Sequence, residues 1–138
     1  MSSFTKPLQV EAISDGTWKI ISPFEYHIGS KESNNIITIL AGFKTDFASV
    51  PKLFWNIFPP YGRTYGKAAV IHDALYTCKK TTRKKADQIF LEGMKVLKAS
   101  IFTRYTMYAA VRLFAWTVWN KRKASDLFIR YELTRLDK

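Results

Sequence analysis

The chain is poor in cysteine and has no long hydrophobic run. Its single cysteine, Cys78, has no second thiol to pair with, so the fold cannot depend on an internal disulfide. The longest apolar-rich stretch, residues 105–119, is interrupted by Arg112 and is shorter than the ~20 residues that span a bilayer. These shortages exclude a disulfide scaffold and predict that no segment crosses a membrane.

A secretory signal is also missing from the start of the sequence. Residues 1–15 have neither the positive region nor the apolar core of a signal peptide, so we expect the protein to be made and to stay in a cytoplasm, or to be released passively from one. With 138 residues, 47% apolar and 24% charged, the chain suits one domain with one core. We expect a single domain over residues 1–138, mainly strands in 1–50 and mainly helices in 51–138.

Acidic residues are scarce in the second part of the chain. The formal net charge is +11, from 22 Lys and Arg against 11 Asp and Glu. Residues 1–60 are balanced, so the excess lies in residues 61–138. Such an excess attracts anionic surfaces, and we expect an anionic phospholipid surface or nucleic acid as a partner. The alternative is that the charge only keeps the protein soluble.

Short strand-like segments fill the first forty residues. Residues 8–13 alternate between apolar and polar side chains, the Asp-Gly pair at 15–16 favours a hairpin turn, and the strand-like residues 17–21 follow. Residues 24–28 and 35–40 flank a polar loop that suits a second hairpin. The pattern predicts a three- or four-stranded antiparallel β-meander.

A connector rich in glycine, proline and aromatic residues follows the strands. Ser49 is expected to cap a short helix that starts near Pro51, and the prolines at 59–60 must end it. We expect four aromatic residues of this connector to be core residues: Phe54, Trp55, Phe58 and Tyr61.

The rest of the chain has a helical pattern. The four predicted helices cover residues 67–78, 82–97, 103–120 and 125–136. Thr81 or Thr82 is expected to cap the second helix, and Ser125 the fourth. Strands followed by helices make the predicted class α+β, with a His-Asp helix hairpin in the helical half.

That hairpin combines a histidine with a carboxylate. His72 and Tyr76 are four residues apart and share a helix face. His72 precedes the midpoint of the turn by as many residues as Asp87 follows it, so antiparallel helices would place them level. An imidazole facing a carboxylate is the geometry of an activated general base. The alternative is a core-edge histidine hydrogen-bonded to Asp87 for structural reasons.

The segments AAVIHDALY (residues 68–76) and ADQIF (residues 86–90) resemble the helix pair of sn-2 phospholipases. The likeness is closest to the disulfide-free version in parvovirus capsid proteins. The resemblance implies that His72 is the base that activates water and that Asp87 is its supporting carboxylate. It also implies that Tyr76 hydrogen-bonds within the same network.

The same resemblance implies Ca²⁺ as the cofactor, with Asp73 as its carboxylate ligand. In that family further ligands come from a glycine-rich loop upstream, for which Gly62 and Gly66 are the candidates here. Asp46 and Ser49 would reach the His72 site as a metal ligand or a hydrogen-bond donor. The interpretation that we prefer for both is a local turn and a helix cap.

A second resemblance covers nearly the whole chain. The blocks TDFASVP (residues 45–51) and HDALY (residues 72–76) are similar to an uncharacterised family common in tailed phages and prophages. This likeness implies a phage origin, a location in the host cytoplasm or in the virion, and other phage proteins as partners. It implies no activity.

The third predicted helix ends in aromatic and basic residues. Trp116, Trp119 and the run Lys121–Lys123 would suit a bilayer interface, whereas core packing is the interpretation that we prefer. We assign no function to His27, and we expect Cys78 to be a small buried hydrophobic residue.

Two functional hypotheses follow from the sequence. The first is a calcium-dependent, phospholipase-like ester hydrolase that uses the His72–Asp87 dyad. The second is a non-catalytic phage accessory or virion component whose basic helical half binds nucleic acid or a protein partner. A third, hydrolysis of another substrate with a metal held by Asp46, His72 and Asp73, has less support.

Overall fold

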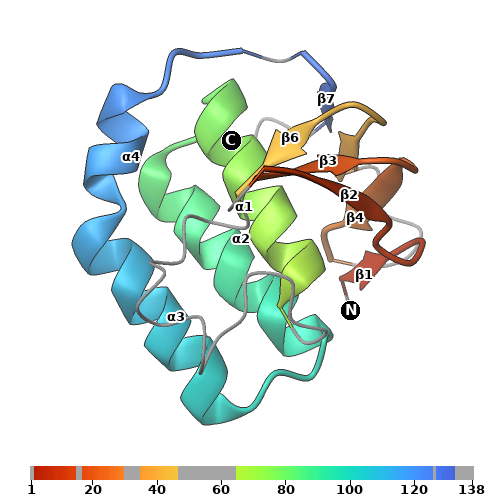
Figure 1. Ribbon diagram of the computed structural model, residues 1–138. Coiled ribbons are helices and arrows are strands. Elements are labelled where there is room, and N and C mark those ends of the chain that lie inside the picture. Colours follow the sequence, from red (N-terminus) through yellow and green to blue (C-terminus); the bar gives the residue numbers. More distant parts are fainter. Residues whose placement is uncertain (1, 15–16, 30–34, 47–64, 126, 133–138) are drawn as a thin grey trace.

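The computed structural model describes residues 2–14, 17–29, 35–46, 65–125 and 127–132 (Figure 1). The strands are β1 (Ser3–Phe4), β2 (Val10–Ser14), β3 (Thr17–Ile20), β4 (Phe24–His27), β5 (Ile36–Ile39), β6 (Lys44–Thr45) and β7 (Ile129–Glu132). The helices are α1 (Gly66–Cys78), α2 (Arg83–Val96), α3 (Ile101–Phe114) and α4 (Trp116–Lys121). Antiparallel strands followed by helices confirm the predicted α+β class.

The strands form two sheets instead of one meander. One sheet has the order β1-β4-β5-β7 and the other β2-β3-β6, and every pairing is antiparallel. The pairings β2–β3 and β4–β5 occur as predicted, but they belong to different sheets. After β5 the chain returns to β3, where the backbone N–H of Ile20 donates to the carbonyl of Phe43 at 2.8 Å. This return pairing gives β3 a neighbour other than β4.

The prediction of a helix over residues 125–136 is wrong. Residues 129–132 form β7, which pairs with β5 in a register that places Ile129 opposite Ile39. Ile129 is buried and Arg130 is exposed, so the side chains alternate as a half-buried strand requires. The free edge of β5 offers this segment a ladder of hydrogen bonds, and that long-range pairing overrides the local helical pattern.

The helices begin and end at local signals. The Thr82 side chain accepts a hydrogen bond from the backbone N–H of Lys85, which confirms the predicted cap of α2. α3 begins two residues earlier than expected, because the Ser100 side chain accepts from the backbone N–H of Thr103. The predicted helix 103–120 is two helices, with Ala115 between α3 and α4.

α1 is buried on nearly every side. It lies between the sheets and α2, and α3 covers the opposite side of α2 (Figure 1). A β-carbon added to Gly93 of α2 would lie 2.9 Å from the β-carbon of Ala68 in α1. The missing side chain of Gly93 therefore allows α1 and α2 to approach closely, which brings their polar side chains within hydrogen-bonding reach.

The two tryptophans at the end of the helical half have different environments. Trp119 is half-buried and packs edge-on against Tyr76, with 5.0 Å between ring centroids. Trp116 is 53% exposed, so core packing is wrong for this residue. Cys78 is buried, as expected.

Two further expectations concern the connector that follows the strands and the absence of a membrane-spanning segment. The predicted cap at Ser49, the helix near Pro51 and the four connector aromatic residues lie outside the described residues. Within the part of the chain that the structure describes, no helix is both long enough and apolar enough to cross a membrane.

Candidate functional site

The helix pair brings His72, Asp87 and Tyr76 together. Nε2 of His72 lies 2.6 Å from Oδ1 of Asp87, and the Tyr76 hydroxyl donates to the same oxygen at 2.7 Å. His72 is 1% exposed and Asp87 is fully buried. The rings of Tyr76 and Phe90 lie 4.2 and 4.8 Å from the imidazole, centroid to centroid, and hold it in place. The predicted juxtaposition of these polar groups across two helices is present.

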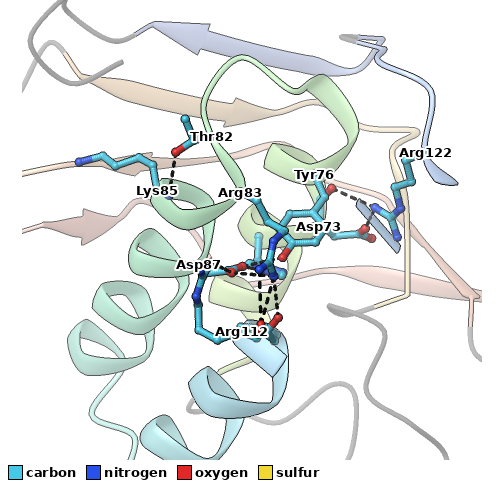
Figure 2. Close-up of polar contacts among 10 residues, drawn as sticks. Asp73, Tyr76, Thr82, Arg83, Lys85, Asp87, Arg112 and Arg122 are labelled. Atoms are coloured by element: carbon cyan, nitrogen blue, oxygen red, sulfur yellow. Dashed lines mark hydrogen bonds and ion pairs between the residues drawn. The ribbon is translucent and has the colours of Figure 1, made fainter. Parts of the chain in front are cut away.

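Two arginines approach the other oxygen of Asp87 (Figure 2). Arg112 of α3 donates to Oδ2 at 2.7 Å, and Arg83 of α2 lies 3.5 Å from the same atom. Arg83 also donates to the backbone carbonyl of Val111 at 3.0 Å, which ties α2 to α3. Our sequence reasoning missed both arginines. The i, i+4 spacing of Arg83 and Asp87 was a usable signal, whereas nothing local connects Arg112 to Asp87.

These contacts fix the charge of the pair. Burial raises the pKa of Asp87, but hydrogen bonds from His72, Tyr76 and Arg112 outweigh burial and lower the pKa below its ordinary value. Burial lowers the pKa of His72 by more than its contacts with Asp87 raise it. At neutral pH the arrangement is therefore an ionised carboxylate beside a neutral imidazole.

The second ring nitrogen of His72, Nδ1, has no hydrogen bond to a described residue. With Asp87 ionised, the shared proton is assigned to Nε2 of His72, which leaves a lone pair on Nδ1. Nδ1 is buried and has no hydrogen-bond partner among the described residues. A buried polar atom without a partner is unusual and calls for an explanation, such as a water molecule or a ligand.

Asp73 belongs to a separate cluster on another side of α1. Its Oδ2 accepts from the Thr45 hydroxyl at 2.8 Å and from the backbone N–H of Asp46 at 3.0 Å. Arg122, which follows α4, donates to Oδ1 and also contacts the Asp46 carboxylate at 3.3 Å. The same guanidinium donates to the Thr77 hydroxyl at 3.0 Å. Figure 2 shows Arg122 reaching Asp73.

This cluster tests the expected calcium site. Burial and the nearby Asp46 carboxylate raise the pKa of Asp73 to about 6, although Arg122 opposes the shift. Both carboxylate oxygens of Asp73 already accept hydrogen bonds, whereas Ca²⁺ needs six to eight oxygen ligands. No group of three or more His, Cys, Asp or Glu that could hold a metal occurs in the described parts of the chain.

The described side chains around Asp73 therefore do not fit a calcium ion as they are arranged. The structure places Asp46 beside Asp73, where the backbone N–H of Asp46 donates to the Asp73 carboxylate, and its role as a metal ligand stays a prediction. Gly62 and Ser49 lie outside the described residues, so their expected roles stay predictions. Our sequence reasoning missed Arg122, which it placed in a basic run with no partner, and it missed Thr45 as a donor.

Comparisons with known proteins give one family and one relative. The chain is 34% identical over 83 residues to "Uncharacterized protein y4jT" of Sinorhizobium fredii (strain NBRC 101917 / NGR234). The aligned segment is 58% of this chain and 25% of that protein, so the match spans about a quarter of the relative. No solved structure matches the chain. A family described as "Protein of unknown function (DUF1353)" matches residues 18–111, which is more than half of the chain and includes both α1 and α2, and the chain belongs to this uncharacterised family.

Proposed function

We propose that the protein is an ester hydrolase in which His72 acts as the general base and Asp87 as its supporting carboxylate. The observation that carries the proposal is the unpartnered, buried Nδ1 of a neutral His72 whose Nε2 is bonded to an ionised carboxylate. A histidine in this state can accept a proton, and the carboxylate stabilises the imidazolium that forms.

The proposed reaction is the attack of water on an ester carbonyl. As the oxygen of water bonds to the carbonyl carbon, its proton passes to Nδ1 of His72. The proton then goes to the leaving alkoxide, the carbon–oxygen bond breaks, and the products are a carboxylic acid and an alcohol. Asp87 keeps its charge throughout, because Tyr76 and Arg112 hydrogen-bond to the carboxylate.

A phospholipid ester is the substrate that we propose. The likeness of AAVIHDALY and ADQIF to sn-2 phospholipases supports it, as does the basic character of residues 61–138. We include no calcium step, because Arg122 and Thr45 take up the oxygens of Asp73. Since His72 is 1% exposed, the proposal also requires that substrate binding opens a path to Nδ1.

The test is fatty-acid release from phosphatidylglycerol vesicles, measured with Ca²⁺ and with a chelator. We expect release in both conditions, and loss of at least ~100-fold in His72→Gln, the scale of general-base catalysis. The matched control is His27→Gln, because His27 pairs with Glu25 on β4 and has no role in the proposal. Circular dichroism confirms folding. No release by the wild-type protein, or equal release by both variants, would overturn the proposal.

A second candidate function rests on charge. The TDFASVP and HDALY blocks support a phage origin, with the protein acting in the host cytoplasm or the virion, and residues 61–138 hold 17 basic against 6 acidic residues. A non-catalytic accessory protein of this kind would bind nucleic acid through its helical half. Its affinity for DNA would fall steeply with salt, because bound counterions are released. Binding that does not change with salt would remove nucleic acid as the partner.

A further inference from the structure

The outer side of α3 and α4 is unusually apolar for an exposed surface. Five large apolar side chains on α3 and α4 are between 52% and 69% exposed. They are Ile101, Phe102, Tyr105, Leu113 and Trp116, and we call them the outer face. An exposed apolar patch marks a site of interaction with a protein, a ligand or a membrane.

The helix geometry explains why these residues are exposed. α3 directs Met107 and Val111 into the core, where both are buried. At about 100° per residue, Phe102, Tyr105 and Leu113 lie on the opposite side of the helix, within about 80° of one another. α3 thus has two apolar sides, and only one is covered by the described residues. Figure 1 shows α3 and α4 at the edge of the molecule, away from the sheets.

The charges around the outer face indicate what covers it. Residues 101–125 contain no Asp or Glu, and they contain five basic residues. Arg112 and Arg122 turn inward to Asp87 and Asp73, whereas Lys121 and Lys123 are exposed and Arg104 is half-exposed. A partner that accepts apolar side chains and carries negative charge would therefore complement this segment.

Three kinds of partner can be compared on these grounds. A second copy would bring two chains of net charge +11 together at surfaces that contain no acidic residue. Nucleic acid would meet the basic residues but would leave Phe102, Leu113 and Trp116 in water. An anionic bilayer takes up apolar side chains at the level of its headgroups, where Trp and Tyr are favoured, and its negative surface attracts Lys and Arg.

We propose that the outer face of α3 and α4 binds the surface of an anionic phospholipid bilayer. The inference deepens the proposed function, because membrane binding would place the protein on a surface that bears its substrate. The role of membrane binding therefore rests on the proposed function. Binding itself can be measured without hydrolysis. The His72–Asp87 dyad is buried, whereas the side chains of the outer face are at least 52% exposed, so the residues that bind the membrane are separate from the dyad.

The experiment is flotation of the protein with vesicles of phosphatidylglycerol and phosphatidylcholine in equal parts. We expect the wild-type protein to bind, and to bind at least ~tenfold more weakly to pure phosphatidylcholine or at high salt. The triple variant Phe102→Ser, Leu113→Ser and Trp116→Ser should bind the mixed vesicles at least ~tenfold more weakly, since each side chain loses its burial in the bilayer.

The chain offers a matched control on another surface. Ile13 and Ile21 are 46% and 51% exposed and precede the helical half, so the variant Ile13→Ser, Ile21→Ser loses exposed apolar area away from the outer face. It should bind as the wild type does. Equal weakening in both variants, or no binding by the wild-type protein, would overturn the inference. A wild-type dimer that the triple variant converts to a monomer would also overturn it, in favour of a second copy.

A further variant keeps this inference distinct from the proposed function. His72→Gln should bind vesicles as the wild type does. Full binding without any hydrolysis defeats the hydrolase alone. Hydrolysis of a dissolved short-chain ester by a protein that does not bind vesicles defeats the membrane surface alone.

Discussion

Nε2 of His72 and Oδ1 of Asp87 lie 2.6 Å apart across two packed helices, in a place where neither side chain is more than 2% exposed. Four side chains from three helices share the Asp87 carboxylate: an imidazole, a phenol and two guanidinium groups. In a buried network of this kind the loss of the shared acceptor removes one hydrogen bond from each donor, and Arg83 alone keeps a described partner, the carbonyl of Val111. Asp87 therefore affects both the stability of the helical half and the protonation of His72.

Asp87→Asn should destabilise the protein strongly. The amide keeps the volume but removes the charge that balances Arg112 and Arg83, and breaking a buried pair costs about 3–5 kcal/mol. We expect the lower end of that range, because the arginine side chains are 31% and 21% exposed and can reach water. Urea unfolding measures the change. As a control, Glu25→Gln removes a pair with His27 in which the Glu25 side chain is 41% exposed, and it should cost under ~1 kcal/mol.

Arg112→Gln should raise the pKa of His72. The Arg112 guanidinium neutralises part of the Asp87 charge, so its removal leaves the carboxylate freer to stabilise an imidazolium. A nuclear magnetic resonance titration of the imidazole Cε1–H signal measures the shift. Arg104→Gln, on the same helix, should leave the titration unchanged. A lower or unchanged pKa in Arg112→Gln would contradict this role of Arg112.

His72 and Asp73 should affect the pH dependence of stability in opposite directions. The pKa of His72 is lowered, so the unfolded chain takes up a proton that the folded chain does not, and stability is lost as pH falls below about 6.5. The pKa of Asp73 is raised to about 6, so its contribution is present below about pH 4 and is lost as pH rises through 6.

Urea unfolding between pH 7 and pH 4 separates the two contributions. Asp73→Asn should lose stability on acidification more steeply than the wild type, because it lacks the stabilisation that protonation of Asp73 adds to the folded protein. His72→Gln should lose stability less steeply, because its unfolded chain has no imidazole at position 72 to take up a proton. Parallel curves for the three proteins would show that neither group titrates as stated.

Gly93→Ala should destabilise the protein by about 1–3 kcal/mol, the usual cost of overpacking. The new methyl group would meet the β-carbon of Ala68 at 2.9 Å and force α1 and α2 apart. Adding Ala68→Gly removes the group that it meets, so the double variant should recover part of the loss in thermal unfolding. If the double variant is no more stable than Gly93→Ala, the close contact is not the cause.

Arg122→Gln should create a response to calcium that the wild-type protein lacks. In the wild type, Arg122 occupies the space between Asp73 and Asp46, and we expect millimolar Ca²⁺ to leave the Tm unchanged. Without the guanidinium the two carboxylates lose their counter-charge, so the variant should have a lower Tm that Ca²⁺ partly restores. Mg²⁺ serves as the comparison ion. A Tm rise in the wild type would instead support the calcium site that the sequence predicted.

The sequence predicted those features that depend on local spacing. The facing of His72 and Asp87 follows from their equal distances to one turn, and the Thr82 cap follows from its place before a helical pattern. The pairing of β2 with β3 follows in the same way from the Asp-Gly pair between them. These signals lie within a few residues, or one hairpin, of what they determine.

The features that the sequence did not predict depend on contacts between distant segments. Arg112 and Arg122 are 25 and 49 residues from the carboxylates Asp87 and Asp73, and no local pattern relates them. β7 forms because β5 has a free edge, which cannot be known before the sheet order is known. The exposure of Trp116 depends likewise on which side of α4 meets α1 and α3.

The position of β7 has a consequence for the order of events during synthesis. β5 is made early, yet one of its two neighbours is encoded almost a hundred residues later. Until residue 132 has left the ribosome, the hydrogen-bonding groups along that margin of β5 stay open to other nascent chains. The sheet that contains β1, β4 and β5 is therefore completed only after β7 has been made. Until then, chaperones or rapid folding must keep the open edge of β5 from pairing with other chains.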